Sequence, residues 1–140
     1  MTDSEKFEGF KQNLINENEK QYGSEIRQKY GDATIDASNK KLMGLSEENY
    51  AKATLVESEI KQFIFDAISK NDHTKESYQK LYDLHKTWLC FFWKDYTLQM
   101  HLGLVEMYTQ DERFAKYYDN IIQGGTDYIY KAINSIMDSE

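Results

Sequence analysis

Proline is absent from the sequence, and cysteine occurs once, as Cys90. The absence of proline excludes collagen-like and proline-rich chains. A single cysteine cannot form an internal disulfide, and without a Cys-x-x-Cys pair the chain lacks the common zinc and thiol-redox motifs. Because Cys90 lies in an aromatic helical segment, we expect its thiol to be buried and unreactive.

Basic residues and long apolar runs are also scarce. The 17 Lys and Arg residues against 24 Asp and Glu residues give a net charge of −7, which repels the phosphates of nucleic acid. No uncharged apolar run approaches the ~20 residues needed to cross a bilayer. The start of the chain, MTDSEKFEGF, lacks the basic and apolar segments of a signal peptide. We therefore expect a cytoplasmic protein that makes no direct contact with nucleic acid or membrane.

The pattern that is present is helical. Apolar residues recur every three or four positions between glycine, Asn, Asp, Ser and Thr residues, and no alternating segment competes with them, so the fold is predicted to be all-α. Residues 1–20 carry few large apolar groups, which predicts a weak helix that orders only against something else, with 21–140 as the folded domain.

Turn residues and caps divide the rest of the chain into helices. Short helices are predicted over 24–30 and 33–43, separated by Gly31 with Asp32 as a cap, and the longest helix is predicted to open at Ser46 and reach about Lys70, with an inner stripe that includes Leu55. Later helices are predicted over 74–92, after Asp95 or Thr97, after Asp111, and over 126–137. Short helices meeting at corners predict a globin-like arrangement of about six to eight helices, without haem.

Aromatic residues are abundant, with 11 Tyr, 7 Phe and 2 Trp, concentrated between Tyr78 and Tyr130. Large aromatic side chains with a polar edge suit broad, flat ligands of low charge. The same spacing is more often typical of core packing, and the pattern alone leaves both interpretations open.

Four segments of the chain together resemble the TipAS antibiotic-recognition domain, the effector module of MerR-type transcriptional activators. They are YGSEIRQKYGDATIDASNKKLMGLSEENY (22–50), LHKTWLCFFW (84–93), MHLGLVEMY (100–108) and DERFAKYYD (111–119). The Phe7-Glu8-Gly9-Phe10 segment is similar to the one that follows the coiled coil in such regulators. The resemblance implies a globin-like fold with a cleft for bulky drugs, whose first helices order around the ligand.

The resemblance also implies a set of ligand-contacting residues. Positions that match the family motifs are His85, Trp88, Phe92, Tyr96, His101, Tyr108 and Tyr117. Helical spacing places the first three on one face, and His101 shares a face with Tyr108. Thiopeptide-binding relatives carry a reactive cysteine where this chain has Tyr96, so we expect reversible binding. The Asp111–Phe114 segment is expected to be a helix start with a structural ion pair.

The function predicted from the sequence is a drug-binding effector domain that triggers transcription within a homodimeric MerR-family regulator. Enzyme motifs such as G-x-S-x-G, a Gly-rich phosphate loop and H-E-x-x-H are missing, and the three scattered histidines specify no metal site, so we expect neither catalysis nor a cofactor. Three alternatives stay open: a stand-alone drug-sequestering protein, a haem protein, and a module that docks a partner protein.

Overall fold

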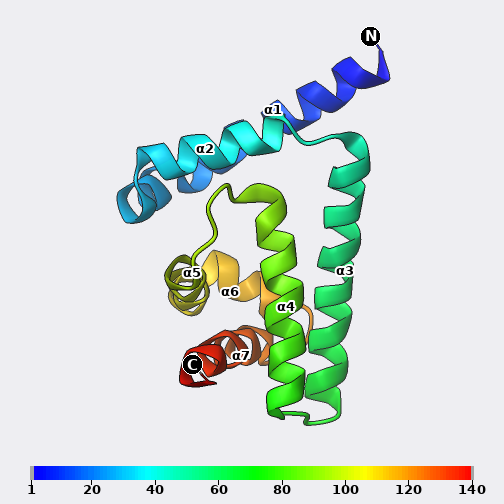
Figure 1. The fold of residues 1–140 in the computed structure, drawn as a ribbon, viewed down its shortest axis with the longest axis vertical. Helices are drawn as coiled ribbons and strands as arrows, with labels where there is room; N and C mark the ends of the chain where they lie inside the picture. The colour runs from blue at the N-terminus through cyan, green and yellow to red at the C-terminus, as the bar shows by residue number, and fades with distance from the viewer. Residues whose placement is uncertain (1, 140) are drawn as a thin grey trace. The chain divides into compact units, whose positions relative to one another are not determined.

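The computed structural model describes residues 2–139, with side chains as far as Met137. Within this range the chain forms seven α-helices and no strand, which confirms the all-α prediction and its helix number. The helices are α1 (Asp3–Tyr30), α2 (Asp32–Met43), α3 (Glu47–Ser69), α4 (Lys75–Phe92), α5 (Leu98–Gln110), α6 (Glu112–Asp119) and α7 (Gly125–Ser139), coloured along the chain in Figure 1. None of these helices is both long and apolar enough to span a membrane.

Two compact units divide the chain. The first contains residues up to Lys52 together with Cys90–Asp95, and the second contains Ala53–Leu89 together with the residues from Tyr96 onward. Helices α3 and α4 therefore begin in one unit and end in the other. The globin-like arrangement and the predicted division after residue 20 stay predictions.

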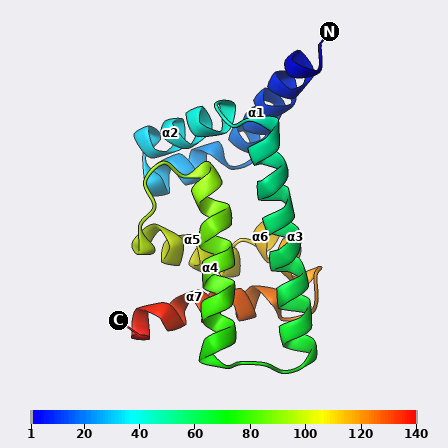
Figure 2. The ribbon, with the colours of Figure 1, turned by 45° about the vertical axis from the view of Figure 1, so that its right-hand side comes forward.

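In the first unit, α1 and α2 fold back on each other and lie side by side (Figure 2). Gly31 makes the turn between them with a φ of 88°, a conformation that glycine adopts without strain. The guanidinium of Arg27 then ties the corner, because it bonds to carboxylates of Glu19 at 2.6 Å, Asp32 at 3.1 Å and Asp36 at 2.8 Å. The turn and this ion-pair cluster together fix the α1–α2 hairpin.

The predicted break before Ser24 is wrong, because α1 runs through Gly23 without interruption. A glycine in a helix interior costs only about 1 kcal/mol relative to alanine. Here its missing side chain leaves room for the Glu19 carboxylate, which lies 2.6 Å from where a β-carbon would be. At 28 residues α1, and not the 23-residue α3, is the longest helix described.

Buried Lys11 caps the end of α2. Its side chain is 1% exposed, and its ammonium donates to the carbonyls of Met43 at 2.6 Å and Leu45 at 2.9 Å while pairing with Glu8. The last carbonyls of a helix have no partner within the helix. Lys11 therefore supplies donors that α2 cannot supply itself.

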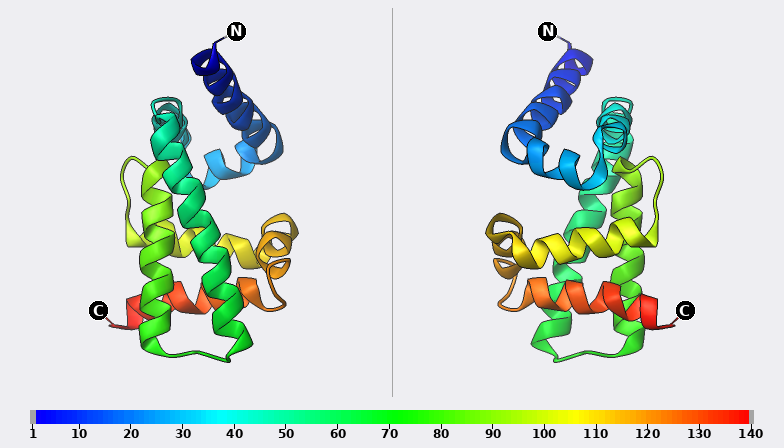
Figure 3. Two further views of the ribbon diagram at one scale, coloured as in Figure 1. Left: turned by 90° about the vertical axis from the view of Figure 1, so that its right-hand side faces the viewer. Right: turned by 90° about the vertical axis from the view of Figure 1, so that its left-hand side faces the viewer.

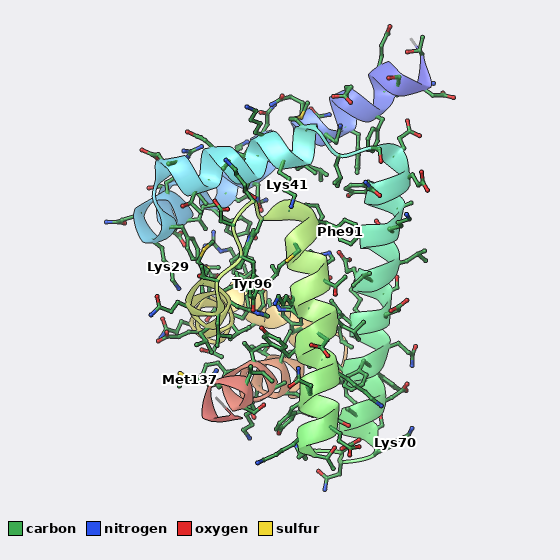
Figure 4. The ribbon with its side chains drawn as sticks, viewed as in Figure 1. Lys29, Lys41, Lys70, Phe91, Tyr96 and Met137 are labelled. Atoms are coloured by element: carbon green, nitrogen blue, oxygen red, sulfur yellow. The ribbon has the colours of Figure 1, made fainter. Side chains whose placement is uncertain are left out.

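Lys41 caps the end of α4 in the same way. Its ammonium donates to the carbonyls of Cys90 at 2.6 Å and Trp93 at 2.9 Å, and the Ser38 hydroxyl donates to the carbonyl of Phe92. Figure 4 labels Lys41 beside this helix end. Both lysine caps lie within the first unit.

The second unit holds the main core. In it α3 and α4 run antiparallel, and α5 and α7 lie side by side across them at a steep angle (Figures 1 and 3). The buried side chains of this core are Ile60, Ile64, Ala67, Leu81, Val105, Tyr108, Tyr118, Tyr128, Ile129, Ala132 and Ile133. The inward face of α7 consists of the buried residues Tyr128, Ile129, Ala132, Ile133 and Ile136.

Most predicted helix starts in the later chain are also confirmed. The hydroxyl of Thr97 accepts from the Met100 amide at 3.1 Å and caps α5. The carboxylate of Asp111 accepts from the Arg113 amide at 3.0 Å and pairs with its guanidinium, so this segment is a helix start with a structural ion pair.

Two local predictions are corrected. Leu55 is 64% exposed, because the buried stripe through Ile60 and Ile64 continues backward to Ala53 and not to Leu55. Asp32 is the first residue of α2 and does not cap it: Gly31 takes the cap position, and the Asp32 carboxylate is held by Arg27.

Candidate functional site

A cavity of about 210 Å³ opens in the second unit, between α3, α4, α5 and α6. Its lining consists of Glu57, Ile60, Lys61, Trp88, Tyr108, Phe114, Tyr117 and Tyr118. Pockets that bury a drug-sized ligand usually measure about 300–1,000 Å³. The cavity is therefore large enough for one aromatic group and too small to enclose a bulky ligand.

Aromatic rings form most of the wall. The Tyr108 ring packs on Tyr118 with centroids 4.7 Å apart and on Phe114 at 5.6 Å, and Tyr117 meets Tyr118 edge-on at 4.9 Å. Tyr117 is 40% exposed and Tyr118 is 5% exposed, so they stand at the rim and at the bottom respectively. Rings locked against one another present a preformed surface on which another ring can stack.

Charged groups meet at the rim. The Lys61 ammonium lies 3.4 Å from a carboxylate oxygen of Glu57 and 4.9 Å from the centroid of the Tyr117 ring. Burial, followed by the Glu57 charge and a hydrogen bond to it, raises the pKa of Tyr117. Burial and the neighbouring Tyr108 also raise the pKa of Tyr118. Both phenols therefore keep their protons at neutral pH and can act as hydrogen-bond donors.

Two fully buried histidines lie behind this wall. His85 Nδ1 is 2.7 Å from His101 Nε2, and His101 Nδ1 is 2.7 Å from the hydroxyl of Tyr96, which donates to Tyr82 at 2.9 Å. Figure 4 labels Tyr96 near α4 and α5. At the other end, the Tyr118 hydroxyl lies 3.5 Å from His85 Nε2. A chain of five polar groups thus extends from the bottom of the cavity to Tyr82.

Both histidines are neutral. Burial, reinforced by the neighbouring His101, lowers the pKa of His85 well below its ordinary value, and burial together with the Lys86 charge lowers the pKa of His101 to about 3. A neutral imidazole has one donor and one acceptor nitrogen. If Tyr118 donates to His85, then His85 donates to His101 and His101 donates to Tyr96, which matches the donation from Tyr96 to Tyr82. The chain of hydrogen bonds can therefore run in one direction without a conflict.

The seven residues predicted as ligand contacts fall into three groups. Trp88, Tyr108 and Tyr117 line the cavity. His85, His101 and Tyr96 form the hydrogen-bonded chain behind it, and the His85 ring stacks on Trp88 with centroids 5.8 Å apart. Phe92 belongs to the first unit, where its carbonyl accepts from Ser38. The role of each in ligand binding stays a prediction.

Sequence reasoning missed the wall that α3 contributes. Glu57 and Lys61 are a helical i,i+4 pair on either side of the inward-facing Ile60. Their spacing could have indicated a place at the rim of a cavity, because residues that flank a buried stripe of a helix stand at its solvent edge. Phe114 and Tyr118 lie on α6, in the helix predicted after Asp111, and neither is among the predicted ligand contacts.

The cysteine and metal predictions concern other parts of the chain. Cys90 is half-buried in the first unit, a less enclosed position than the buried one predicted. The hydroxyl of Tyr96 is engaged by His101 and Tyr82. Among the side chains of residues 2–137, no three or more His, Cys, Asp and Glu residues gather into a metal-binding group.

Comparison with known proteins gives one match. The family model of the TipAS antibiotic-recognition domain matches residues 22–136, which include every residue of the cavity and of the histidine chain. No curated protein and no solved structure matches the chain. Because the family model covers most of the 140 residues, the chain belongs to the TipAS antibiotic-recognition domain family.

Proposed function

We propose that this domain recognises bulky antibiotics or similar drugs by inserting one of their aromatic groups into the α3–α6 cavity. The observation that carries the proposal is the cavity wall, in which five aromatic side chains surround about 210 Å³. Trp88, Tyr108 and Tyr117 in this wall occupy the positions that match the family motifs. Stacking on preformed rings supplies affinity at a low cost in conformational entropy.

Binding at this site is reversible in the proposal. A tyrosine stands at position 96, and the single cysteine lies outside the lining of the cavity. The ligand is therefore held without a covalent bond, by stacking on the aromatic wall of the cavity. Because the cavity takes only one ring, the rest of a bulky drug must gain contacts outside the cavity.

A thermal-shift screen tests the binding step. A ligand at about 100 times its dissociation constant stabilises a fold by roughly 2.7 kcal/mol, which is a few degrees for a domain of this size. We expect bulky aromatic antibiotics to shift the melting temperature, and we expect Tyr117→Ala to weaken the shift. The matched control is Phe65→Ala, because Phe65 is a similarly exposed aromatic residue that is not part of the cavity. Equal loss in both variants, or no shift across a broad panel, would contradict the proposal.

The regulatory part of the proposal is that ligand binding activates transcription through a DNA-binding domain and a dimerising coiled coil in a MerR-type regulator. Its support is the family to which the domain belongs. The reading frame upstream of Met1 tests it directly. A helix-turn-helix followed by heptads in that frame supports the regulator, and an in-frame stop codon contradicts it and favours a stand-alone protein that sequesters the drug.

A further inference from the structure

We propose that the α3–α6 cavity selects organic cations, so that the group it takes is a flat or compact apolar group bearing a positive charge. This inference rests on the proposed function, because it concerns the ligand of the same cavity. It adds a charge requirement that stacking alone does not impose. Three observations carry it: the ring faces, the carboxylate at the rim and the lysine that already sits there.

The ring faces favour a cation. An aromatic face carries partial negative charge and attracts an ammonium or pyridinium group, most strongly on Trp and Tyr. Trp88, Tyr108 and Tyr117 all line the cavity, together with Phe114 and Tyr118. Five aromatic side chains around one small volume resemble the aromatic enclosures that bind quaternary ammonium groups.

Glu57 supplies the countercharge. Its carboxylate lies at the rim, where it pairs with Lys61 at 3.4 Å and is hydrogen-bonded to Tyr117. Glu57 is 38% exposed and Lys61 is 42% exposed at their side chains. Solvent-exposed ion pairs of this kind contribute little stability. A ligand cation can therefore take the place of Lys61 beside Glu57 at small cost.

Lys61 itself shows that the rim accommodates a cation. Its ammonium stands 4.9 Å from the centroid of the Tyr117 ring while it pairs with Glu57. The flexible lysine stem can swing into solvent, so this ammonium acts as an internal competitor that a tighter-stacking cation displaces. The net charge of −7 further raises the concentration of cations around the molecule.

A pair of isosteric probes tests the charge requirement. The cation 1-methylquinolinium and the neutral 1-methylnaphthalene have nearly the same shape and differ in charge. Isothermal titration of the 140-residue chain with each is expected to give a dissociation constant about tenfold lower for the cation. Equal affinity for the two probes would overturn the inference and leave the proposed function standing.

Variants of the two charged residues sharpen this test. Glu57→Gln should weaken binding of the cation and leave the neutral probe unaffected, whereas Lys61→Met should strengthen binding of the cation. Glu59→Gln is the matched control, because Glu59 is an exposed residue on the same helix outside the cavity and its loss changes the net charge equally. Equal effects of Glu57→Gln and Glu59→Gln would mean that only the overall charge matters, which overturns the site.

The two proposals fail in different ways. If neither probe binds while bulky antibiotics still shift the melting temperature through Tyr117, the cation inference is wrong and the proposed function holds. If antibiotics produce no shift that depends on Tyr117 but 1-methylquinolinium binds and depends on Glu57, the cavity binds cations and the antibiotic proposal is wrong.

Discussion

At the scale of single residues, His85 and His101 are unusual because two ionisable side chains are fully buried and only 2.7 Å apart. Each stays neutral and satisfies the other, since one nitrogen can donate while the facing nitrogen accepts. A buried polar group without a partner costs about 1–3 kcal/mol, so this mutual satisfaction makes the pair tolerable in the core. Protonating either ring would place a charge where water cannot reach it.

The pair predicts acid sensitivity. Histidines in an unfolded chain titrate at about pH 6.5. Burial in the folded chain lowers the pKa of His101 to about 3 and also lowers the pKa of His85. Between these pKa values the unfolded chain binds more protons than the folded chain. The contribution of the two histidines to the free energy of unfolding is therefore fully present above about pH 6.5 and is lost as the pH falls below it. The expected slope is at most about 1.4 kcal/mol per pH unit for each histidine. Urea denaturation measured at several pH values checks this.

The matched variants for this prediction are His101→Gln and His73→Gln. His101→Gln removes one of the buried rings and should flatten the acid slope, measured as the change in unfolding free energy with pH. His73→Gln removes an exposed imidazole and controls for the loss of one histidine. A slope unchanged by His101→Gln would show that other groups cause the acid sensitivity.

At the scale of elements, the start of α7 depends on the smallest side chain. A β-carbon at Gly125 would lie 2.3 Å from the Tyr118 carbonyl oxygen and 3.6 Å from a methyl group of Ile64. The backbone of α7 therefore approaches the end of α6 as closely as glycine alone permits. Tyr118 forms the bottom of the cavity, so this approach also holds the cavity wall.

We predict that Gly125→Ala destabilises the fold by about 1–3 kcal/mol, because the clash is with backbone and cannot be relieved by a rotamer change. Chemical denaturation measures the loss. Gly9→Ala is the control, since nothing lies within 4 Å of a β-carbon there and the helix should gain up to about 1 kcal/mol. A neutral Gly125→Ala variant would show that α6 and α7 shift apart freely.

The helices and their first residues are the features that the sequence predicts best. Caps such as Thr97 and Asp111 act locally, so their side chains predict where a helix begins. Gly23 misled the prediction because glycine often ends a helix, whereas here the Glu19 carboxylate of the same helix, held by Arg27, fills the space that Gly23 leaves. The cavity residues on α3 escaped notice for a different reason, which is tertiary: helical spacing shows the face on which Glu57 stands and not what lies opposite it.

At the scale of the whole molecule, the two units are stabilised by different means. The large cluster of buried apolar residues lies entirely in the second unit. In the first unit the buried apolar side chains are Ile15, Ile35 and Leu45, and the lysine caps and the Arg27 cluster provide much of the rest. Polar contacts of this kind are individually weaker than burial of a core, so the first unit should open more easily.

Amide hydrogen exchange followed by mass spectrometry checks this difference. Peptides from residues 3–45 are expected to exchange faster than peptides from α7, because local opening needs less free energy where few apolar groups are buried. A saturating antibiotic should slow exchange in the same peptides if the first helices order around the ligand. Exchange in residues 3–45 as slow as in α7 would contradict the first expectation, and exchange unchanged by ligand would contradict the second.

The position of Trp88 has an optical consequence. The chain contains two tryptophans, of which Trp88 lines the cavity and Trp93 belongs to the first unit. Indole emission responds to the polarity and to the electron acceptors around the ring. A ligand that expels water from around Trp88 therefore shifts the emission maximum of Trp88, and a quinolinium that stacks on Trp88 quenches its fluorescence. In a Trp93→Phe variant the emission comes from Trp88 alone. The molecule then reports the occupancy of its own cavity by fluorescence, without any attached dye.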